Sequence, residues 1–552
     1  VNACIKMLSL YAKFFNTTEY IPPLSQFAAI FVFGSLILME ALNLVKLRLV
    51  SRSSRAQVVH KAANLIKASS HVVYDNYPKI ELSAAKLTGL HPVPYKATAK
   101  DGDLAGVIHD SSGKFGITMK DFQALYFISS YSRIRGCFHR ECVGLPGAAV
   151  SLREDDGSVS ECINLGSYNY LNFSQTTYKI ESIRETMQTY GISWCYKGAL
   201  ATSALQVCLE QHLSEFLGTE ACIVHSMGFD TNAMAIPCIC RSIDEGGTVL
   251  ICDSLNHASL VSGANLAKRT VGATVEVFTH NDFEELRVLL DKYQGRNVVV
   301  IVEGLYSMDG DILELPRFLE LRKCYAFRLF VDEAHSIGCL GPTGRGVSDY
   351  YNMHGSIDIQ MGTFTKSFAA VGGYIAGPVA LIDKIRREVI HYNACALIPP
   401  YCAIQIQNAL AELLQDRARL LQLRKNSIMF RSGLKEIGYV VYGTYDSPVI
   451  PVLLYNPVKL KPVADELRRR GIAIVVVGYP AVPLVSSRIR FCISSGHTEE
   501  QLRQVLCHMK QIAHLYCLRH GHQKGKNQLI EMCKGILSPP IHPLAETERE
   551  ET

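Results

Sequence analysis

The sequence predicts an α/β fold built on a large, mostly parallel sheet, and two patterns carry that prediction. From Cys162 onward, short runs of β-branched residues alternate with amphipathic stretches, as in strands that alternate with helices around a parallel sheet. The clearest strands are residues 249–252, 298–302 and 329–331. After about Gly377 the pattern becomes helical and then strand-rich, with strands expected at 475–477 and 489–493, which indicates a smaller second α/β domain.

The length and composition permit several domains. The chain has 552 residues, of which 48% are hydrophobic and 19% charged, enough to bury a large core over two or three domains. In chain order we expect a membrane-anchor region at 1–60, an N-terminal extension at 61–160, the large domain at 161–377, the smaller domain at 378–518 and a polar tail at 519–552.

An apolar segment near the beginning of the sequence predicts a membrane anchor. No charged residue occurs from Phe27 to Met39, and apart from Glu40 the apolar character continues to Val45. That length is close to what a helix needs to cross a thin bilayer. Four basic residues follow between positions 46 and 55, so the positive-inside rule places the rest of the chain in the cytosol. Because of Glu40, an interfacial or a buried helix is an alternative to a spanning one.

Charge and cysteine usage argue against two other classes of protein. The formal net charge of +5 is small and is not gathered into a basic stripe, so no nucleic-acid partner is expected. The 18 cysteines are scattered through a large chain and are expected to be reduced and mostly buried. Neither the group of Cys137, His139 and Cys142 nor the pair of Cys238 and Cys240 has the spacing of a structural zinc site, so no metal is expected.

One lysine lies among small and hydroxyl residues. Lys366 is preceded by Thr363 and Thr365 and followed by Ser367, with two glycines at 372 and 373. A lysine that forms a Schiff base must be partly desolvated so that its amine is available near neutral pH, and neighbouring hydroxyl groups can hydrogen-bond a phosphate. Taken alone, a lysine among threonines is more often a surface residue, so the rest of the sequence has to decide.

Three polar residues at or after the ends of predicted strands point to pyridoxal phosphate as the cofactor. Asp332 follows the strand 329–331, and strand ends are where open α/β sheets bind their ligands. Its carboxylate can pair with the protonated pyridine nitrogen of that cofactor, although an aspartate here can also cap a helix. His335 is close enough along the chain to reach the ring hydroxyl, and His257, after the strand that ends at Cys252, can stack on the ring.

Taken in order along the chain, these segments resemble the α-oxoamine synthase family of fold-type I pyridoxal-phosphate enzymes. The similarity runs from about Asn164 to His497 and is strongest to the lysine-bearing members that form sphingoid bases. The motifs that carry it are residues 166–171, 332–338, 341–347, 361–368, 475–480 and 490–492. The resemblance implies a fold-type I transferase with pyridoxal 5'-phosphate as its cofactor.

The resemblance also implies roles for individual residues. Lys366 corresponds to the lysine that binds the cofactor covalently, Asp332 to the partner of the ring nitrogen, and His257 to the stacking base. His335 corresponds to the contact of the ring oxygen. Arg490 corresponds to the arginine that binds the substrate carboxylate, for which a guanidinium fork suits a planar anion. The other implied cofactor and substrate contacts are Gly228, Phe229, Thr363, Thr365, Tyr168 and Asn169.

The resemblance further implies substrates, a partner and a location. We expect L-serine and a long-chain acyl-CoA, which condense with loss of carbon dioxide to 3-ketosphinganine in the first step of sphingolipid biosynthesis. We expect the endoplasmic reticulum membrane, with the catalytic domain facing the cytosol, and a heterodimer with a related subunit that lacks the lysine. Ala394, Cys395 and Ala396 stand where homodimeric relatives have hydroxyl residues that reach the neighbouring chain's phosphate, which such a partner would restore.

Some positions depart from the family pattern. The segment 192–208 lacks the usual glycine-rich stretch with an arginine and a histidine, and Ser226 replaces a glycine, which affects substrate handling but not the cofactor residues. Two alternatives stay open: another α-oxoamine synthase, of the 5-aminolevulinate synthase or glycine C-acetyltransferase type, and an inactive scaffold subunit. Lys366 argues against the scaffold, and the apolar segment together with residues 475–480 favours the sphingolipid enzyme. The sequence leaves open the acyl-chain length and the choice among serine, alanine and glycine.

Overall fold

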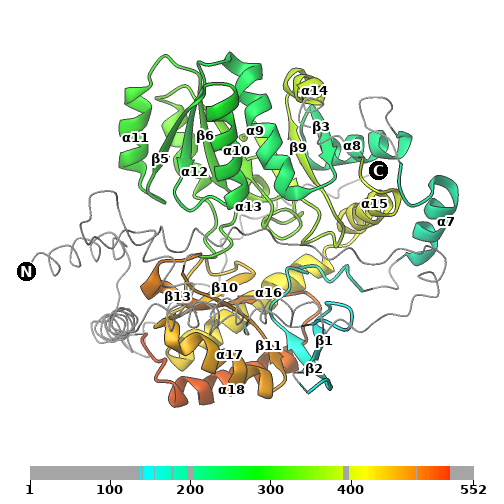
Figure 1. Cartoon of the computed structure of the whole chain (residues 1–552), viewed down its shortest axis with the longest axis vertical. Coiled ribbons are helices and arrows are strands. Elements are labelled where there is room, and N and C mark those ends of the chain that lie inside the picture. The colour runs from blue at the N-terminus through cyan, green and yellow to red at the C-terminus, as the bar shows by residue number, and fades with distance from the viewer. Residues whose placement is uncertain are drawn as a thin grey trace, which may run out of the picture. The chain divides into compact units, whose positions relative to one another are not determined.

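The structure, a computed structural model, describes residues 137, 141–154, 156–175, 179–194, 203–388, 397–479 and 481–521. The predicted membrane segment from Phe27 to Val45, most of the predicted extension, residues 394–396 and most of the polar tail lie outside these ranges. Within the described ranges, no helix is both long and apolar enough to cross a bilayer. All described residues belong to one compact unit of the chain (Figure 1).

A seven-stranded sheet forms the centre of the large domain. Its strands lie in the order β3-β9-β8-β7-β6-β4-β5, and only β9 runs antiparallel to its neighbours. The bounds are β3 Ala221–His225, β4 Val249–Asp253, β5 Thr274–Phe278, β6 Val298–Glu303, β7 Arg328–Asp332, β8 Ile359–Thr363 and β9 Gly373–Gly377. The predicted mostly parallel sheet is therefore confirmed, and the three clearest predicted strands are β4, β6 and β7.

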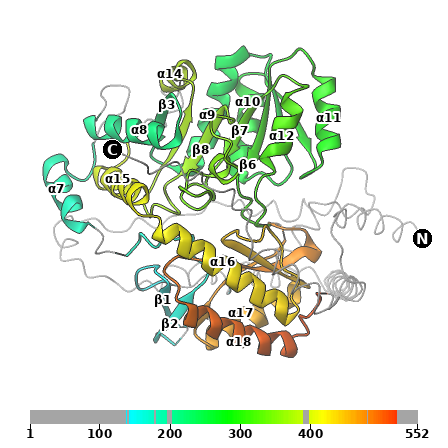
Figure 2. The same cartoon turned by 180° about the vertical axis from the view of Figure 1, so that it is seen from behind.

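The strands of this sheet are buried because they are apolar over most of their length. Every residue of β4, β6, β8 and β9 is buried, as in sheets that helices cover on both faces. Figures 1 and 2 show from opposite sides that the sheet and its helices form the mostly green part of the molecule. These helices are α8 Ala204–Leu217, α9 Gly228–Asp244, α10 Ala258–Thr270, α11 Phe283–Lys292, α12 Leu315–Arg322, α13 Val347–Tyr350 and α14 Val379–Glu388.

Helices α9 and α10 approach each other closely. A Cβ atom at Gly263 of α10 would lie 2.7 Å from the carbonyl oxygen of Asn232 in α9, so a side chain there would push the two helices apart. Near the start of α10, the hydroxyl of Ser259 accepts a hydrogen bond of 2.9 Å from the side-chain amide of Asn232. The close packing therefore places the amino-terminal halves of both helices next to the same strand ends.

A second, smaller sheet follows along the chain. It is antiparallel and has the order β10-β13-β12, with β10 at Val449–Tyr455, β12 at Val475–Val477 and β13 at Ser487–Cys492. The predicted strands at 475–477 and 489–493 thus form β12 and β13. The helices of this part of the chain, yellow to red in Figure 2, are α15 Pro400–Gln415, α16 Ala418–Ile437, α17 Leu460–Arg469 and α18 Glu499–Leu515.

A third sheet combines strands that precede the large domain in the sequence with one that follows it. Strand β2 (Val159–Asn164) pairs antiparallel with β1 (Ala149–Arg153) and parallel with β11 (Ile472–Ala473). Helix α7 (Ile180–Tyr190) follows and packs against α15. Strand β2 lies across the boundary expected at residue 161, and the domain boundaries themselves remain predictions.

The loop after β6 connects the large sheet to the smaller one through hydrogen bonds. Asp309 in this loop accepts a hydrogen bond of 2.6 Å from Nη1 of the buried Arg488 in β13. Arg488 and Arg490 share a face of β13 because side chains two residues apart on a strand point the same way. Both arginines also contact Met308. The loop therefore holds Arg490 close to the carboxyl ends of the large sheet.

Candidate active site

Polar side chains gather at the carboxyl ends of four strands. Asp253, Glu303 and Asp332 are the last residues of β4, β6 and β7, and Lys366 follows the end of β8. Parallel strands place these ends at one edge of the sheet, where ligands of such folds bind. The structure thus brings the predicted Asp332 and Lys366 together. Glu303 and Asp253 were not predicted as site residues, although each is a carboxylate at the end of an apolar strand, the signal that identified Asp332.

Lys366 has the partly desolvated amine that its predicted role requires. The residue is half-buried, and its Nζ lies 5.9 Å from the centroid of the Tyr168 ring. Burial lowers the pKa of Lys366, although the carboxylates of Asp332 and Glu303 oppose that shift. A lowered pKa leaves more of the unprotonated amine that a Schiff base needs.

Asp332 is buried and accepts two hydrogen bonds. Its Oδ2 accepts from Nδ2 of Asn232 at 2.7 Å, and its Oδ1 accepts from the backbone N–H of Ala334 at 2.8 Å. The second bond is the capping contact that the sequence offered as an alternative, so this carboxylate caps the following turn and lies at the site as well. Asn232 was not predicted, because its position inside α9 carries no local signal.

His335 is buried next to two tyrosines. Its Nδ1 lies 2.8 Å from the hydroxyl of Tyr170, and its ring lies edge-on to Tyr168 with centroids 5.2 Å apart. Burial, together with the nearby Lys366, lowers the pKa of His335 well below its ordinary value. The imidazole is therefore neutral near pH 7 and can form one hydrogen bond with a ligand oxygen.

His257 is held at both its backbone and its ring. Its backbone N–H donates to Oε1 of Glu303, and its Nδ1 lies 2.8 Å from the hydroxyl of Ser259. The ring is exposed and edge-on to Phe229, with centroids 6.1 Å apart. Partial burial lowers the pKa of His257, so that this ring is also neutral near pH 7. An exposed, fixed and neutral ring fits the predicted stacking role.

Four predicted cofactor residues meet at the start of α9. A Cβ atom at Gly228 would lie 2.7 Å from Cγ2 of Thr363, and the hydroxyl oxygens of Thr363 and Thr365 lie 3.4 Å apart. Phe229 follows Gly228 in the first turn of the helix. The start of a helix presents backbone N–H groups to an anion, and the threonine hydroxyls can add donors. This arrangement suits a phosphate group.

Arg490 and Tyr168 form the predicted substrate side of the site. Nη2 of Arg490 donates to the hydroxyl of Tyr168, and the guanidinium lies 4.9 Å from the centroid of that ring. Among the described residues, Nε of Arg490 is buried without a hydrogen-bond partner. The side-chain amide of Asn169 donates to Pro146 O at 3.1 Å and to Ser174 Oγ at 2.6 Å, and its role as a substrate contact remains a prediction.

A histidine between two carboxylates lies at the β5 side of this sheet edge. Nδ1 of His280 lies 2.9 Å from Oδ2 of Asp253, and its Nε2 lies 3.3 Å from Oδ2 of Asp311. Burial disfavours the charged form, but the hydrogen bonds to both carboxylates outweigh it and raise the pKa of His280 to about 10. His280 is therefore a cation near neutral pH. Sequence analysis did not identify this group, because only the order of the strands brings its members together.

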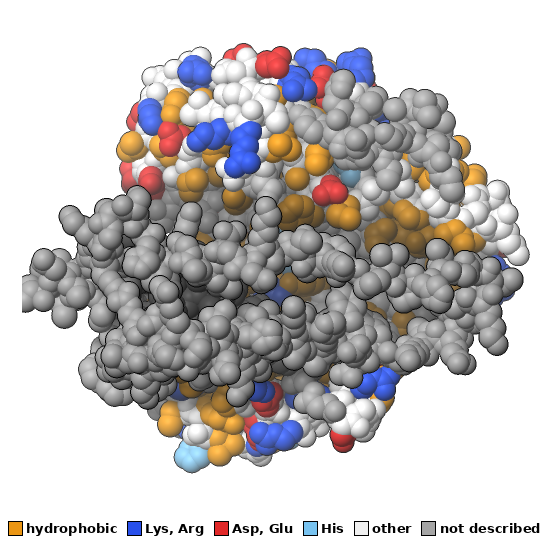
Figure 3. Space-filling model, viewed as in Figure 1, with side chains coloured by type: hydrophobic (Ala, Val, Ile, Leu, Met, Phe, Trp, Pro, Cys, Tyr) orange, Lys and Arg blue, Asp and Glu red, His pale blue; other side chains and the backbone are white. Residues whose placement is uncertain are grey.

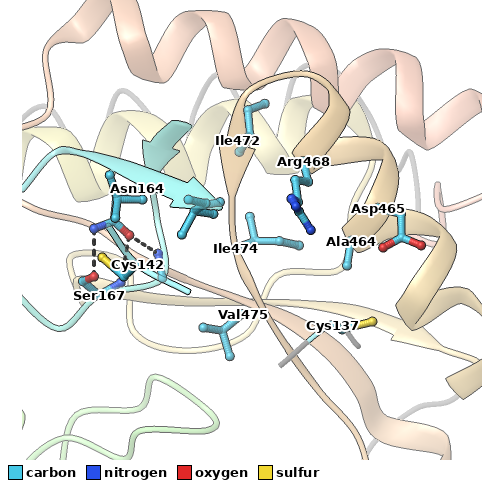
Figure 4. Close-up of a pocket in the computed structure, with 14 residues that line it drawn as sticks. Cys137, Cys142, Asn164, Ser167, Ala464, Asp465, Arg468, Ile472, Ile474 and Val475 are labelled. Carbon is cyan, nitrogen blue, oxygen red and sulfur yellow. Dashed lines mark hydrogen bonds between the residues drawn. The ribbon is translucent and has the colours of Figure 1, made fainter. Parts of the chain in front are cut away.

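A separate pocket of about 390 Å³ lies between the β1–β2 hairpin and α17. Figure 4 shows Asp465 and Arg468 of α17 along one side of it, and the amide of Asn164 donating to Ser167 Oγ at 2.8 Å on the other. No residue predicted to bind cofactor or substrate lines this pocket. It is therefore distinct from the site around Lys366.

Fold and site define the class of this protein. Residues 160–509 match the family model of aminotransferase class I and II. A solved serine palmitoyltransferase from Sphingomonas wittichii has a TM-score of 0.65 at 26% identity, over 74% of this chain and 99% of that chain. A high-resolution structure of a serine palmitoyltransferase with pyridoxal phosphate has a TM-score of 0.66 at 26% identity, over 72% of this chain and 99% of that one.

Eukaryotic relatives narrow the class further. Serine palmitoyltransferase 2 of Dictyostelium discoideum is 38% identical over 440 residues, which are 74% of this chain and 87% of that protein. Serine palmitoyltransferase 2 of Caenorhabditis elegans is 39% identical over 439 residues, 73% of this chain and 77% of that protein. The chain belongs to the serine palmitoyltransferase 2 family.

Replacing His280 by glutamine should flatten the pH dependence of stability on the alkaline side. The folded pKa is about 10 against about 6.5 when unfolded, so the stabilisation is complete below pH 6.5 and is lost as the pH rises toward 10. One proton accounts for a slope of up to about 1.4 kcal/mol per pH unit. Chemical denaturation at a series of pH values measures that slope. The exposed His212→Gln variant should keep the wild-type slope, and an equal slope in His280→Gln would contradict the prediction.

Proposed function

We propose that this chain is the lysine-bearing catalytic subunit of a serine C-palmitoyltransferase. Such an enzyme condenses L-serine with a long-chain acyl-CoA, with loss of carbon dioxide, to 3-ketosphinganine, the first step of sphingolipid biosynthesis. The observation that carries the proposal is the half-buried amine of Lys366 next to the buried carboxylate of Asp332, in a chain of the serine palmitoyltransferase 2 family.

Pyridoxal phosphate fits the residues of the site. A lysine that binds it covalently must supply an unprotonated amine, which the lowered pKa of Lys366 favours. The buried Asp332 can hold a protonated ring nitrogen. The start of α9 at Gly228 packs closely against Thr363 and can present backbone N–H groups to a phosphate, and the exposed ring of His257 can cover a planar ligand.

Each of these residues has a separate role in the proposed reaction. When bound, pyridoxal phosphate supplies the electron sink that stabilises negative charge at the α-carbon of an amino acid. Lys366 can hold or release a proton at Nζ, and Asp332 keeps a negative charge at the ring-nitrogen end. The neutral His335 orients a ligand oxygen. The guanidinium of Arg490 can bind the carboxylate of serine as a planar fork, with Tyr168 fixing its position.

Two other functions are less well supported. Other α-oxoamine synthases share Lys366 and Asp332, but the relatives reported above carry the name serine palmitoyltransferase. An inactive scaffold has no need of a desolvated lysine beside a buried carboxylate, which argues against that alternative. In the divergent segment 192–208, residues 195–202 lie outside the described ranges.

The segment from Phe27 to Val45 is proposed to attach the chain to the endoplasmic reticulum membrane, with the catalytic domain in the cytosol. Support comes from its apolar length and from the basic residues between positions 46 and 55. A long-chain acyl substrate and a lipid product are consistent with an enzyme at a membrane surface.

The chain is also proposed to work as a heterodimer with a related subunit that lacks the lysine. Ala394, Cys395 and Ala396 offer no hydroxyl groups for a neighbouring site. Around the described site, Met227, Phe229, Leu255 and Val371 are large apolar residues that are exposed. Hydrophobic side chains also gather on the right of the face shown in Figure 3. Exposed apolar surface of this kind favours association with another subunit.

Replacing Lys366 by alanine should abolish the covalent adduct that borohydride traps between lysine and pyridoxal phosphate. Condensation of serine with palmitoyl-CoA should fall by roughly a hundredfold or more, because the covalent link and the proton-transfer group are lost together. Mass spectrometry of the reduced protein locates the adduct, and product formation measures the rate. The exposed Lys510→Ala variant should behave as wild type. Turnover by Lys366→Ala near the wild-type rate, or a wild-type adduct at another lysine, would contradict the assignment.

Deleting the residues before about Ser51 should release the chain from membranes when it is expressed without partners. The segment from Phe27 to Val45 would supply most of the apolar area buried in a bilayer. Flotation of membranes on a density gradient measures the bound fraction. Deleting residues 522–552 is the matched control and should leave binding unchanged. Equal flotation of both truncated chains would argue against an anchor at this position.

Expression of the chain alone should give weaker cofactor binding than co-expression with its lysine-less relative. Each missing hydrogen bond to a charged phosphate costs about 1.5–3 kcal/mol. Retention of pyridoxal phosphate through gel filtration and the yield of 3-ketosphinganine measure the difference. Restoring hydroxyl groups with Ala394→Ser and Ala396→Ser should recover part of the retention in the chain alone. Full activity and full retention by the unmodified chain alone would contradict the heterodimer requirement.

A further inference from the structure

Four neighbouring strands place a row of ionisable residues along one edge of the sheet. The strands are β7, β6, β4 and β5, and the row is Asp332, Glu303, Asp253 and His280. Glu303 and Asp332 are directly paired in the register of β6 and β7. Paired residues of adjacent strands lie about 5 Å apart, so two charged carboxylates here would repel strongly.

The two outer carboxylates of the row have partners that favour their charge. Asp253 is hydrogen-bonded to the cationic His280 at 2.9 Å. Asp332 accepts 2.7 and 2.8 Å hydrogen bonds from Asn232 and Ala334, and it raises the pKa of Lys366 against burial. Glu303 lies between them and forms no ion pair within 4 Å among the described residues. Burial first, and Asp332 next, raise the pKa of Glu303 well above its ordinary value, although the His257 N–H and Lys366 oppose this.

Glu303 also begins a chain of hydrogen bonds that ends at Asp332, its register partner on β7. Its Oε1 accepts from the backbone N–H of His257, whose Nδ1 contacts Ser259. Ser259 accepts from the amide of Asn232, and the same amide donates to Asp332, the register partner of Glu303. This chain connects His257, the predicted stacking residue, to Asp332, the predicted partner of the pyridine nitrogen of the cofactor. Moving Glu303 would therefore move His257 relative to Asp332.

We propose that Glu303 is a positioning residue of the cofactor site that acts as a neutral acid. It keeps its proton on the carboxyl group, fixes His257 through the backbone N–H, and leaves Asp332 as the negative charge next to the cofactor ring. The inference rests on the proposed use of pyridoxal phosphate by this chain. A second negative charge at Glu303 would favour the protonated amine of Lys366 and oppose its covalent role.

The test compares Glu303→Gln with Glu303→Ala in the full-length protein. An amide oxygen can accept from His257 N–H as the acid does, without charge, so Glu303→Gln should leave the pH midpoint of the bound pyridoxal phosphate absorbance unchanged. Glu303→Ala removes the acceptor, and the dissociation constant for pyridoxal phosphate should rise about five- to tenfold, as expected for one lost hydrogen bond. The exposed Glu284→Gln variant serves as the control for both readouts.

A fall of about one pH unit or more in the midpoint of Glu303→Gln would overturn the proposal, because removing an ionised carboxylate destabilises the protonated chromophore by roughly 1.4 kcal/mol or more. Unchanged cofactor affinity in Glu303→Ala would overturn the positioning role. A wild-type protein that binds no pyridoxal phosphate would instead refute the proposed function.

Infrared spectroscopy of the wild-type protein provides a test that needs neither a variant nor the cofactor. Glu333, a second buried acid, has a pKa raised by burial to about 8 and loses its proton above that pH. A carbonyl band of protonated carboxylic acid that persists at about pH 9 is expected from Glu303, since a normal glutamate is ionised there. The absence of that band would overturn the neutral-acid assignment.

Discussion

A buried carboxylate next to a half-buried lysine is the constraint on which the rest of this structure depends. Leaving a charge such as Asp332 in the interior costs several kcal/mol unless hydrogen bonds and an opposite charge compensate it. Asn232, Ala334 and Lys366 provide that compensation. Asn232, which donates to Asp332, lies where α9 packs closely on α10, because Gly263 has no side chain to separate the two helices. Compensation of the charge of Asp332, at the end of β7, thus involves a residue at the packed interface of α9 and α10.

The same constraint determines how charge is arranged along the edge of the sheet. Adjacent parallel strands bring Asp332, Glu303 and Asp253 close to one another, and three like charges in a region of low dielectric constant would be unfavourable. Glu303, whose pKa is raised, lies between Asp332 and Asp253. The cationic His280 lies next to Asp253, at the end of the row. The amine of Lys366 then experiences mainly Asp332 and the effect of burial. Burial lowers the pKa of Lys366 by more than Asp332 raises it.

The substrate side depends on a contact between two sheets. Arg490 belongs to β13 of the smaller sheet, whereas Lys366 and Asp332 lie at the large one. The buried ion pair between Arg488 and Asp309 connects them. Removing one partner of such a pair leaves an uncompensated charge in the interior, which is strongly destabilising. The position of Arg490 is therefore coupled to the loop that follows β6.

The sequence by itself determined the α/β class and the main strands, and it identified most of the candidate cofactor residues. These depend on local patterns: apolar runs that end in a carboxylate, a lysine among hydroxyl residues, and motifs in a fixed order. The structure placed Gly228, Phe229, Thr363 and Thr365 together as the resemblance implied. The sequence does not show that the amide of Asn169 donates to Pro146 and Ser174, and its role as a substrate contact remains a prediction.

Only the tertiary structure decided the protonation of the site and the residues that support it. Asn232, Glu303 and His280 are distant from Lys366 along the chain, and their contacts arise from strand order and helix packing. A pKa depends on burial and on charges within a few ångströms, and no spacing in the sequence reports either of them. For the same reason the sequence could propose Lys366 as the reactive lysine, whereas its lowered pKa became evident only from its burial, which outweighs the opposing effect of Asp332 and Glu303.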